Sequence, residues 1–267
     1  MKPRIIYYLV SILSVTAIIY FFFFRWKPDS IYGDDLYIHT TLTGNSLQDQ
    51  INALLASEKF RPVQIFFMHF QIDLLKDNLN AYYLYNVCFQ ALNTIVFAQI
   101  VNIFLKSRYV SLLFSLTFGL SRFAFFNLEE VLLGGRESVA LFSFLMAFYF
   151  LLKVIKANEY SNAKKTSNVL LSILFSNIAM YTHERYIVLL VFVLIMILVS
   201  FSLRTLSNRK RLLLFSIALA SIVINIILKK FVFGVSFLVG TDNTHINISA
   251  ASSFDFLLQA ILSIFQI

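Results

Sequence analysis

The sequence predicts an all-α fold, a polytopic bundle of transmembrane helices with interfacial helices in its first outer loop. Of the 267 residues, 59% are hydrophobic and only 13% are charged, a composition that excludes an ordinary soluble domain. Runs of about 20 apolar residues recur, and this length crosses a hydrocarbon core of about 30 Å. With only seven Gly and three Pro, the chain has few positions that would interrupt a helix.

Seven apolar runs, within a single transmembrane domain that covers residues 1–267, are candidate spans. The first follows a basic start and ends in Arg25-Trp26-Lys27 without a small-residue cleavage site, so we predict a retained helix and not a signal peptide. The run at 167–182 is short. The spans are expected near residues 5–24, 80–105, 109–126, 138–155, 167–182, 186–203 and 212–228.

The long first outer loop, about 25–79, is expected to carry structure of its own. Its segment 46–57 places apolar side chains at helical spacing with polar ones opposite, which predicts an amphipathic helix at the membrane interface. After Phe60-Arg61-Pro62, the string VQIFFMHFQIDLL is too short to span and predicts an interfacial or re-entrant helix.

Two other features of the sequence limit the class of protein to which this chain can belong. The single Cys88 excludes an intrachain disulfide framework, and its apolar surroundings predict a buried, inert thiol. The chain ends in FDFLLQAILSIFQI, which reads as part of a further helix. We therefore expect these residues to be the N-terminal part of a longer membrane domain.

Charge predicts the orientation. With a cytoplasmic N-terminus and alternating spans, the inner loops hold one of the 14 acidic residues, Glu159, and 12 of the 22 basic ones. This asymmetry satisfies the positive-inside rule, and it explains the net charge of +8 by contact with membrane lipids and without nucleic acid. The inner basic residues are Lys2, Arg4, Lys106, Arg108, Lys153, Lys156, Lys164, Lys165, Arg204, Arg209, Lys210 and Arg211.

Three outer segments carry candidate chemistry. Asp34-Asp35, just beyond the first span, could supply a general base for an acceptor hydroxyl, with the second carboxylate orienting or binding metal; the alternative is a solvated turn after Gly33. In NLEEVLLGGRES, Glu129 and Glu130 lie near Arg136, whose planar fork suits a phosphate. The alternative there is a charged turn with an Arg–Glu surface pair.

The third segment contains His183 and Glu184, in the turn AMYTHERYIVL. A short polar turn that only connects two helices explains this segment equally well. Arg61 could bind a phosphate or extend its side chain toward water beside Glu58. No HExxH motif is present and the His residues are scattered, so we expect no metal–His cluster, although a divalent cation remains an open alternative as a cofactor.

In order and spacing, these strings resemble the GT-C superfamily of polytopic glycosyltransferases. They are most similar to its protein O-mannosyltransferase-like branch, which includes transmembrane enzymes with tetratricopeptide repeats. The resemblance covers about residues 1–203, and Ser121-Arg122 replaces the His-Pro and His183-Glu184 the Lys-Glu typical of that branch. The strings are GDDLYI, FRPVQIFFMHF, LNAYYLYNVCFQALNTIVFAQIV, LFSLTFGLSRFAFFNLEEVLLGGRESVALF and AMYTHERYIVL.

The resemblance implies inverting transfer of a sugar from a polyprenyl- or dolichyl-phosphate donor to a hydroxyl of a protein, lipid or glycan, on the periplasmic, extracytoplasmic or ER lumenal face. It implies Asp34 as the base, Asp35 as an assisting or metal-binding group, and Glu130 as a pocket residue. Arg136 and Arg61 would bind the lipid phosphate. Two alternatives stay open: a transporter or flippase of lipid-linked sugars, and an inactive membrane scaffold.

Overall fold

A computed structural model describes residues 3–31, 33–56, 60–156, 160–200, 203 and 206–234. Over these residues the prediction of an all-helical chain is confirmed, because they contain helices, turns and bends and no strand. Glu58, Glu159, Arg204, the His at position 245 and the segment FDFLLQAILSIFQI lie outside the described residues.

The helices follow one another with short connections. They are α1 (Pro3–Phe23), η1 (Phe24–Trp26), α2 (Gly33–Leu42), α3 (Leu47–Ala56), α4 (Pro62–Leu75), α5 (Leu79–Leu105), α6 (Arg108–Gly119), α7 (Arg122–Glu129), α8 (Leu133–Lys156), α9 (Asn162–Thr182), η2 (Glu184–Tyr186), α10 (Ile187–Val199), α12 (Asn208–Ile227) and the π-helix η3 (Leu228–Val232).

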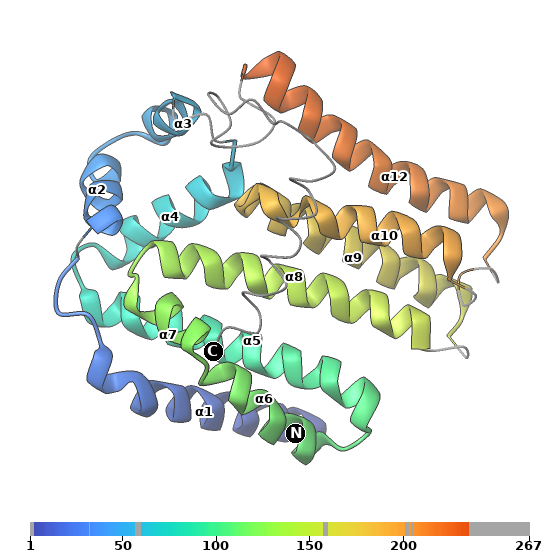
Figure 1. The fold of residues 1–267 in the computed structure, drawn as a ribbon, viewed down its shortest axis with the longest axis horizontal. Coiled ribbons are helices and arrows are strands. Elements are labelled where there is room, and N and C mark those ends of the chain that lie inside the picture. Colours follow the sequence, from blue (N-terminus) through green and yellow to red (C-terminus); the bar gives the residue numbers. More distant parts are fainter. Residues whose placement is uncertain are drawn as a thin grey trace, which may run out of the picture.

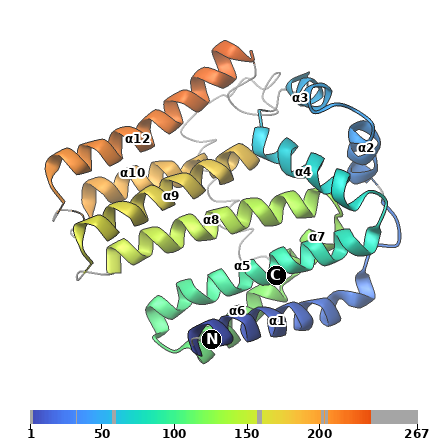
Figure 2. The ribbon, with the colours of Figure 1, turned by 180° about the vertical axis from the view of Figure 1, so that it is seen from behind.

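The long helices lie side by side along one direction, and α2, α3 and α4 gather at one end of this bundle (Figures 1 and 2). We call this the α2–α4 end. Helices α5 and α8 form the centre, where α8 packs on α5 on one side and on α9 on the other. Helix α1 packs on α5, while α10 and α12 pack on each other and on α9.

Four helices in the described part of the chain are long and apolar enough to cross a membrane: Leu9–Trp26, Leu79–Leu105, Leu133–Lys156 and Asn208–Val232. They coincide with four of the seven predicted spans. The predicted span 109–126 is instead divided, because α6 ends at Gly119 and the Ser121 hydroxyl accepts a hydrogen bond from the Ala124 N–H to begin α7. The predicted span 186–203 corresponds to α10, whose 13 residues extend only about 20 Å at about 1.5 Å per residue. This length is shorter than a hydrocarbon core of about 30 Å.

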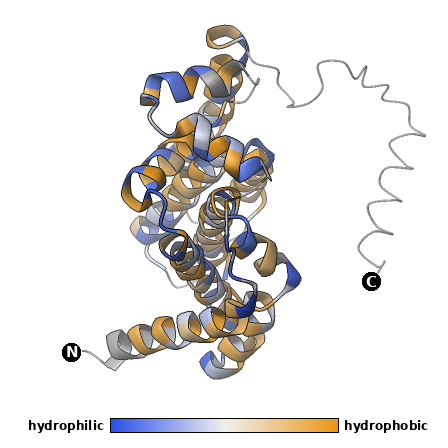
Figure 3. Ribbon diagram, turned by 90° about the vertical axis from the view of Figure 1, so that its left-hand side faces the viewer, coloured by the Kyte–Doolittle hydropathy of each residue, from blue (hydrophilic) through white to orange (hydrophobic). Residues whose placement is uncertain are grey.

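Many large apolar side chains of the bundle helices are exposed, and hydrophobic residues recur along the helices in Figure 3. Large side chains such as Leu13 of α1 and Leu212 of α12 are 68% and 66% exposed, as expected for helices that face lipid. The prediction of a buried Cys88 is wrong, because this thiol is exposed on α5. In a lipid-facing helix an apolar run need not be internal, and the sequence pattern did not separate the two faces of α5.

Gly134 and Gly135 lie where the start of α8 closely approaches other parts of the chain. A Cβ atom on Gly134 would lie 2.1 Å from the backbone oxygen of Asn127, and one on Gly135 would lie 3.0 Å from side-chain atoms of Asn86 and Gln71. Both glycines therefore let the start of α8 contact the end of α7 and the polar side chains of α4 and α5. This contact fixes the first turn of α8, which carries Arg136.

Candidate functional site

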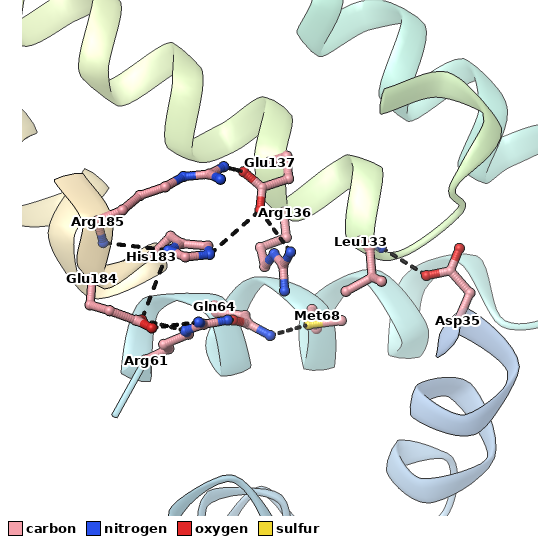
Figure 4. Close-up of polar contacts among 10 residues, drawn as sticks. All are labelled: Asp35, Arg61, Gln64, Met68, Leu133, Arg136, Glu137, His183, Glu184 and Arg185. Carbon is pink, nitrogen blue, oxygen red and sulfur yellow. Dashed lines mark hydrogen bonds and ion pairs between the residues drawn. The ribbon is translucent and has the colours of Figure 1, made fainter. Parts of the chain in front are cut away.

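Charged side chains from three parts of the chain meet at the α2–α4 end (Figure 4). We call Arg61, Arg136, Glu137, His183, Glu184 and Arg185 the ion cluster. At its centre Arg61 makes a bidentate pair with Glu184, with Nε–Oε2 and Nη2–Oε1 distances of 2.5 and 2.6 Å. Their side chains are only 7% and 16% exposed, so this pair links α4 to η2 in a partly dehydrated setting.

A second set of contacts is centred on Glu137, one residue beyond Arg136 in α8. One carboxylate oxygen accepts from Arg136 Nη2 at 2.7 Å, and the other accepts from Arg185 Nη2. His183 Nε2 lies 4.0 Å from Glu137 Oε1, and His183 Nδ1 lies 3.9 Å from Glu184 Oε2. The imidazole thus joins the two halves of the ion cluster.

The ion cluster carries more positive than negative charge. It contains three guanidinium groups and two carboxylates, and the Nε of Arg136 is buried without a hydrogen-bond partner in the described part of the chain. Lys229 of η3 is 2% exposed and interacts electrostatically with Glu184 and Arg61, so a fourth cation reaches the same region. An anion would balance this excess.

The protonation states follow from these neighbours. Burial raises the pKa of Glu184, but the hydrogen bonds and charge of Arg61 outweigh that effect and lower the pKa to about 2. Burial, helped by the charge of Arg61, lowers the pKa of His183 to about 4. At neutral pH Glu184 is therefore ionised and His183 is neutral.

The His183 shift predicts how stability depends on pH. The folded protein holds this proton less tightly than the unfolded chain, whose His has a pKa near 6.5, so stability is lost as pH falls from about 6.5 to about 4. The loss should be at most about 3 kcal/mol. Thermal unfolding of the purified protein at a series of pH values should show this slope, and His183→Gln should flatten it. An unchanged slope in His183→Gln would assign it to other groups.

The two aspartates of the predicted pair have different environments. Asp34 is exposed in the first turn of α2. Asp35 is 5% exposed, and its two carboxylate oxygens accept from the backbone N–H groups of Val131 and Leu133, the latter at 2.9 Å (Figure 4). Burial raises the pKa of Asp35, while these backbone hydrogen bonds lower it in part. Asp35 thus joins α2 to the start of α8.

Glu130 interacts electrostatically with both aspartates and with Arg136 and Glu137 of the ion cluster. Burial raises its pKa, with a further contribution from the charge of Asp35, while Arg136 opposes the shift. Its backbone oxygen accepts from the Asn86 amide at 3.0 Å, which holds the turn between α7 and α8. Glu129, the last residue of α7, also interacts with its surroundings.

The structure therefore brings together most of the predicted site residues: Arg61, Arg136, His183 and Glu184 lie in one cluster, with Glu130 electrostatically coupled to Arg136. The alternative of an Arg–Glu pair at the GGRES turn is also present, as Arg136–Glu137, but this pair is largely buried. Within the described ranges, no group of three or more His, Cys, Asp or Glu side chains is arranged to hold a metal ion.

Sequence reasoning missed Glu137 and Lys229 as members of this region. It also missed a stripe of amide side chains on α5, where Asn86, Gln90 and Asn93 are fully buried and each has an amide atom with no partner among the described residues. Their spacing of four and three residues places them on one helix face, which is the signal that could have found them. Asn93 donates to the Ser138 oxygen at 3.1 Å, so the stripe faces α8.

Searches with family models, against curated proteins and against solved structures found no match to this chain.

Proposed function

We propose that this chain is a membrane glycosyltransferase that moves a sugar from a polyprenyl- or dolichyl-phosphate donor to an acceptor hydroxyl, with inversion. The observation that carries this proposal is the convergence of Arg61, Arg136 and Arg185 from α4, α8 and η2 against only two carboxylates. A phosphate leaving group gains charge as its bond to the sugar breaks, and fixed guanidinium groups stabilise that charge.

The proposed topology has seven crossings, a cytoplasmic N-terminus and the α2–α4 end on the non-cytoplasmic face, within a GT-C type of membrane domain. The divided α6–α7 segment would make the third crossing. Support comes from the sequence, which puts 12 of 22 basic residues in loops at the opposite end. The lipid tail of the donor would then lie beside the apolar helices while its phosphate reaches the ion cluster.

In the proposed reaction Asp34 accepts the proton of the acceptor hydroxyl as its oxygen attacks the anomeric carbon. The bond from that carbon to the phosphate oxygen breaks on the opposite side, and its electron pair leaves with the lipid phosphate. Arg136, with an unpartnered Nε, is the residue best placed to bind this phosphate. Asp35 positions the first turn of α8, and Glu130 lines the pocket between base and phosphate.

A transfer assay on the full chain, with a radiolabelled polyprenyl-phosphate sugar and a hydroxyl acceptor, tests this proposal. Arg136→Gln should lower kcat/KM for the donor by roughly 30-fold or more, since losing one partner of a partly buried charge contact costs about 2–5 kcal/mol. Arg122→Gln is the matched control, because Arg122 is exposed at the start of α7 and contacts Phe126. Equal activity of the two variants would exclude Arg136 from donor binding.

A second candidate function, transport of a lipid-linked sugar, is favoured by the α5 stripe. Asn86, Gln90 and Asn93 place unpaired amide atoms along a membrane-spanning helix, and polar groups at that depth mark translocation pathways in many transporters. Labelling of single cysteines at Gln90 and Arg136 from each membrane face decides between the two. Access from both faces would support transport, whereas access from the outer face alone supports transfer.

A further inference from the structure

A groove is lined by residues at the end of α10 and the start of α12. These two helix ends lie opposite the α2–α4 end of the bundle (Figure 1). Its volume is about 500 Å³, within the range of ligand-binding cavities. Leu198 and Leu212 line it and are 55% and 66% exposed, so the groove is continuous with the lipid-facing surface. Ile197 and Phe215 complete its apolar wall.

The rim of the groove is basic. Arg209 and Arg211 line it and Lys210 stands between them in the first turns of α12, and no carboxylate within the described segments forms an ion pair with any of the three. Arg211 Nη2 donates to the backbone oxygens of Ile197 and Leu198 at 3.4 and 3.2 Å, while its Nε is buried without a hydrogen-bond partner among the residues that the structure describes. Two hydrogen bonds therefore hold the Arg211 side chain in place, and its Nε–H remains as a donor for a ligand.

An apolar groove with a cationic rim selects a ligand that has both an aliphatic chain and an anionic head. We propose that this groove binds an anionic phospholipid of the cytoplasmic leaflet, with an acyl chain against Leu198, Leu212 and Phe215 and the phosphate beside Arg209 and Arg211. The Ser207 side chain accepts from the Lys210 N–H at the start of α12, so only the N–H groups of Asn208 and Arg209 would add to the attraction. Basic pockets between transmembrane helices on this side bind such headgroups.

The site is separate from the ion cluster, so it could stabilise the α10–α12 pair without a part in sugar transfer. Lipid binding at this groove can be tested without measuring sugar transfer and without knowing the orientation of the chain in the membrane. The full chain is purified in detergent, and binding of phosphatidylglycerol and phosphatidylcholine with identical acyl chains is measured by native mass spectrometry. Inorganic phosphate serves as a competitor, which distinguishes a lipid site from a site for free phosphate.

Arg209→Gln/Lys210→Gln should weaken phosphatidylglycerol binding by roughly 30-fold, since each basic residue near a lipid surface contributes about 1 kcal/mol. Binding of phosphatidylcholine should not change. The matched control is Lys156→Gln/Lys164→Gln, which removes the same charge from the same end. Lys156 of α8 contacts Phe104, and Lys164 of α9 contacts Tyr160 just before that helix; neither lysine lines the groove. The control should retain wild-type selectivity for phosphatidylglycerol.

Leu198→Trp fills the groove without changing charge and should also weaken phosphatidylglycerol binding, with the unfolding temperature reporting that the fold is kept. Three results would overturn the proposal. Equal losses in the two charge variants would indicate a diffuse attraction, full binding by Leu198→Trp would show that no acyl chain enters the groove, and complete competition by inorganic phosphate would indicate a site for free anions.

Discussion

Replacement of Asp34 by Asn is expected to slow sugar transfer by roughly 10²- to 10⁴-fold, the usual contribution of a general base. Asp34 is exposed in the first turn of α2, so the change removes a proton acceptor without leaving a buried group unpaired. The unfolding temperature should therefore stay close to that of the wild type. The measurement is kcat with saturating lipid-phosphate sugar donor, on the full chain in a membrane or nanodisc.

Asp29→Asn is the control, because it makes the same change in charge on an exposed residue of the same loop. Asp35→Asn should behave in the opposite way to Asp34→Asn. One of its two backbone donors would face an NH₂ group, and a buried donor without an acceptor costs about 1–3 kcal/mol, so the loss should appear in stability. Transfer that persists undiminished in Asp34→Asn would remove this residue as the base.

The second large effect is expected at the pair Arg61–Glu184. Removing one member of a buried ion pair leaves the other charge without compensation, which costs about 3–5 kcal/mol. Arg61→Met and Glu184→Gln should each lower the unfolding temperature strongly, because the two side chains are only 7% and 16% exposed. Thermal unfolding in detergent, followed by intrinsic fluorescence, measures the change.

Two further variants define the origin of that loss. The double variant Arg61→Met/Glu184→Met should recover part of the stability, since neither member of the pair is left without the other, but it should not recover donor binding. Asp73→Asn breaks the exposed pair with His69, at 3.1 Å, and should change stability by less than about 1 kcal/mol. A single Arg61 variant as stable as Asp73→Asn would mean that water reaches the Arg61–Glu184 pair.

The sequence predicted the local structure of this chain well where periodicity or length was decisive. The helices expected at 46–57 and after Arg61-Pro62 are α3 and α4. In α2, Asp34 is exposed and Asp35 is buried. Which of the two is buried could not be predicted, because it depends on where the start of α8 packs.

Tertiary contacts explain most of what the sequence left open. Arg61 and Glu184 were both singled out as site residues, yet nothing in the local pattern pairs residues that are 123 positions apart. Lys229 was not predicted as a site residue, because many ordinary transmembrane spans also end in basic residues such as Lys229-Lys230. Its burial beside the ion cluster results from the packing of α12 and η3, which short-range pattern does not encode.

The hydrogen bonds of Asp35 also constrain how the chain is assembled. Their acceptor and donors are 96 and 98 residues apart, and Arg61 must wait for a partner 123 residues later. During synthesis, α2 and α4 are therefore made long before the groups that hold them. A nascent chain that ends between residues 133 and 184 would have the donors for Asp35 but not the partner of Arg61. We therefore expect the protease sensitivity of residues 61–75 to persist until η2 has been made.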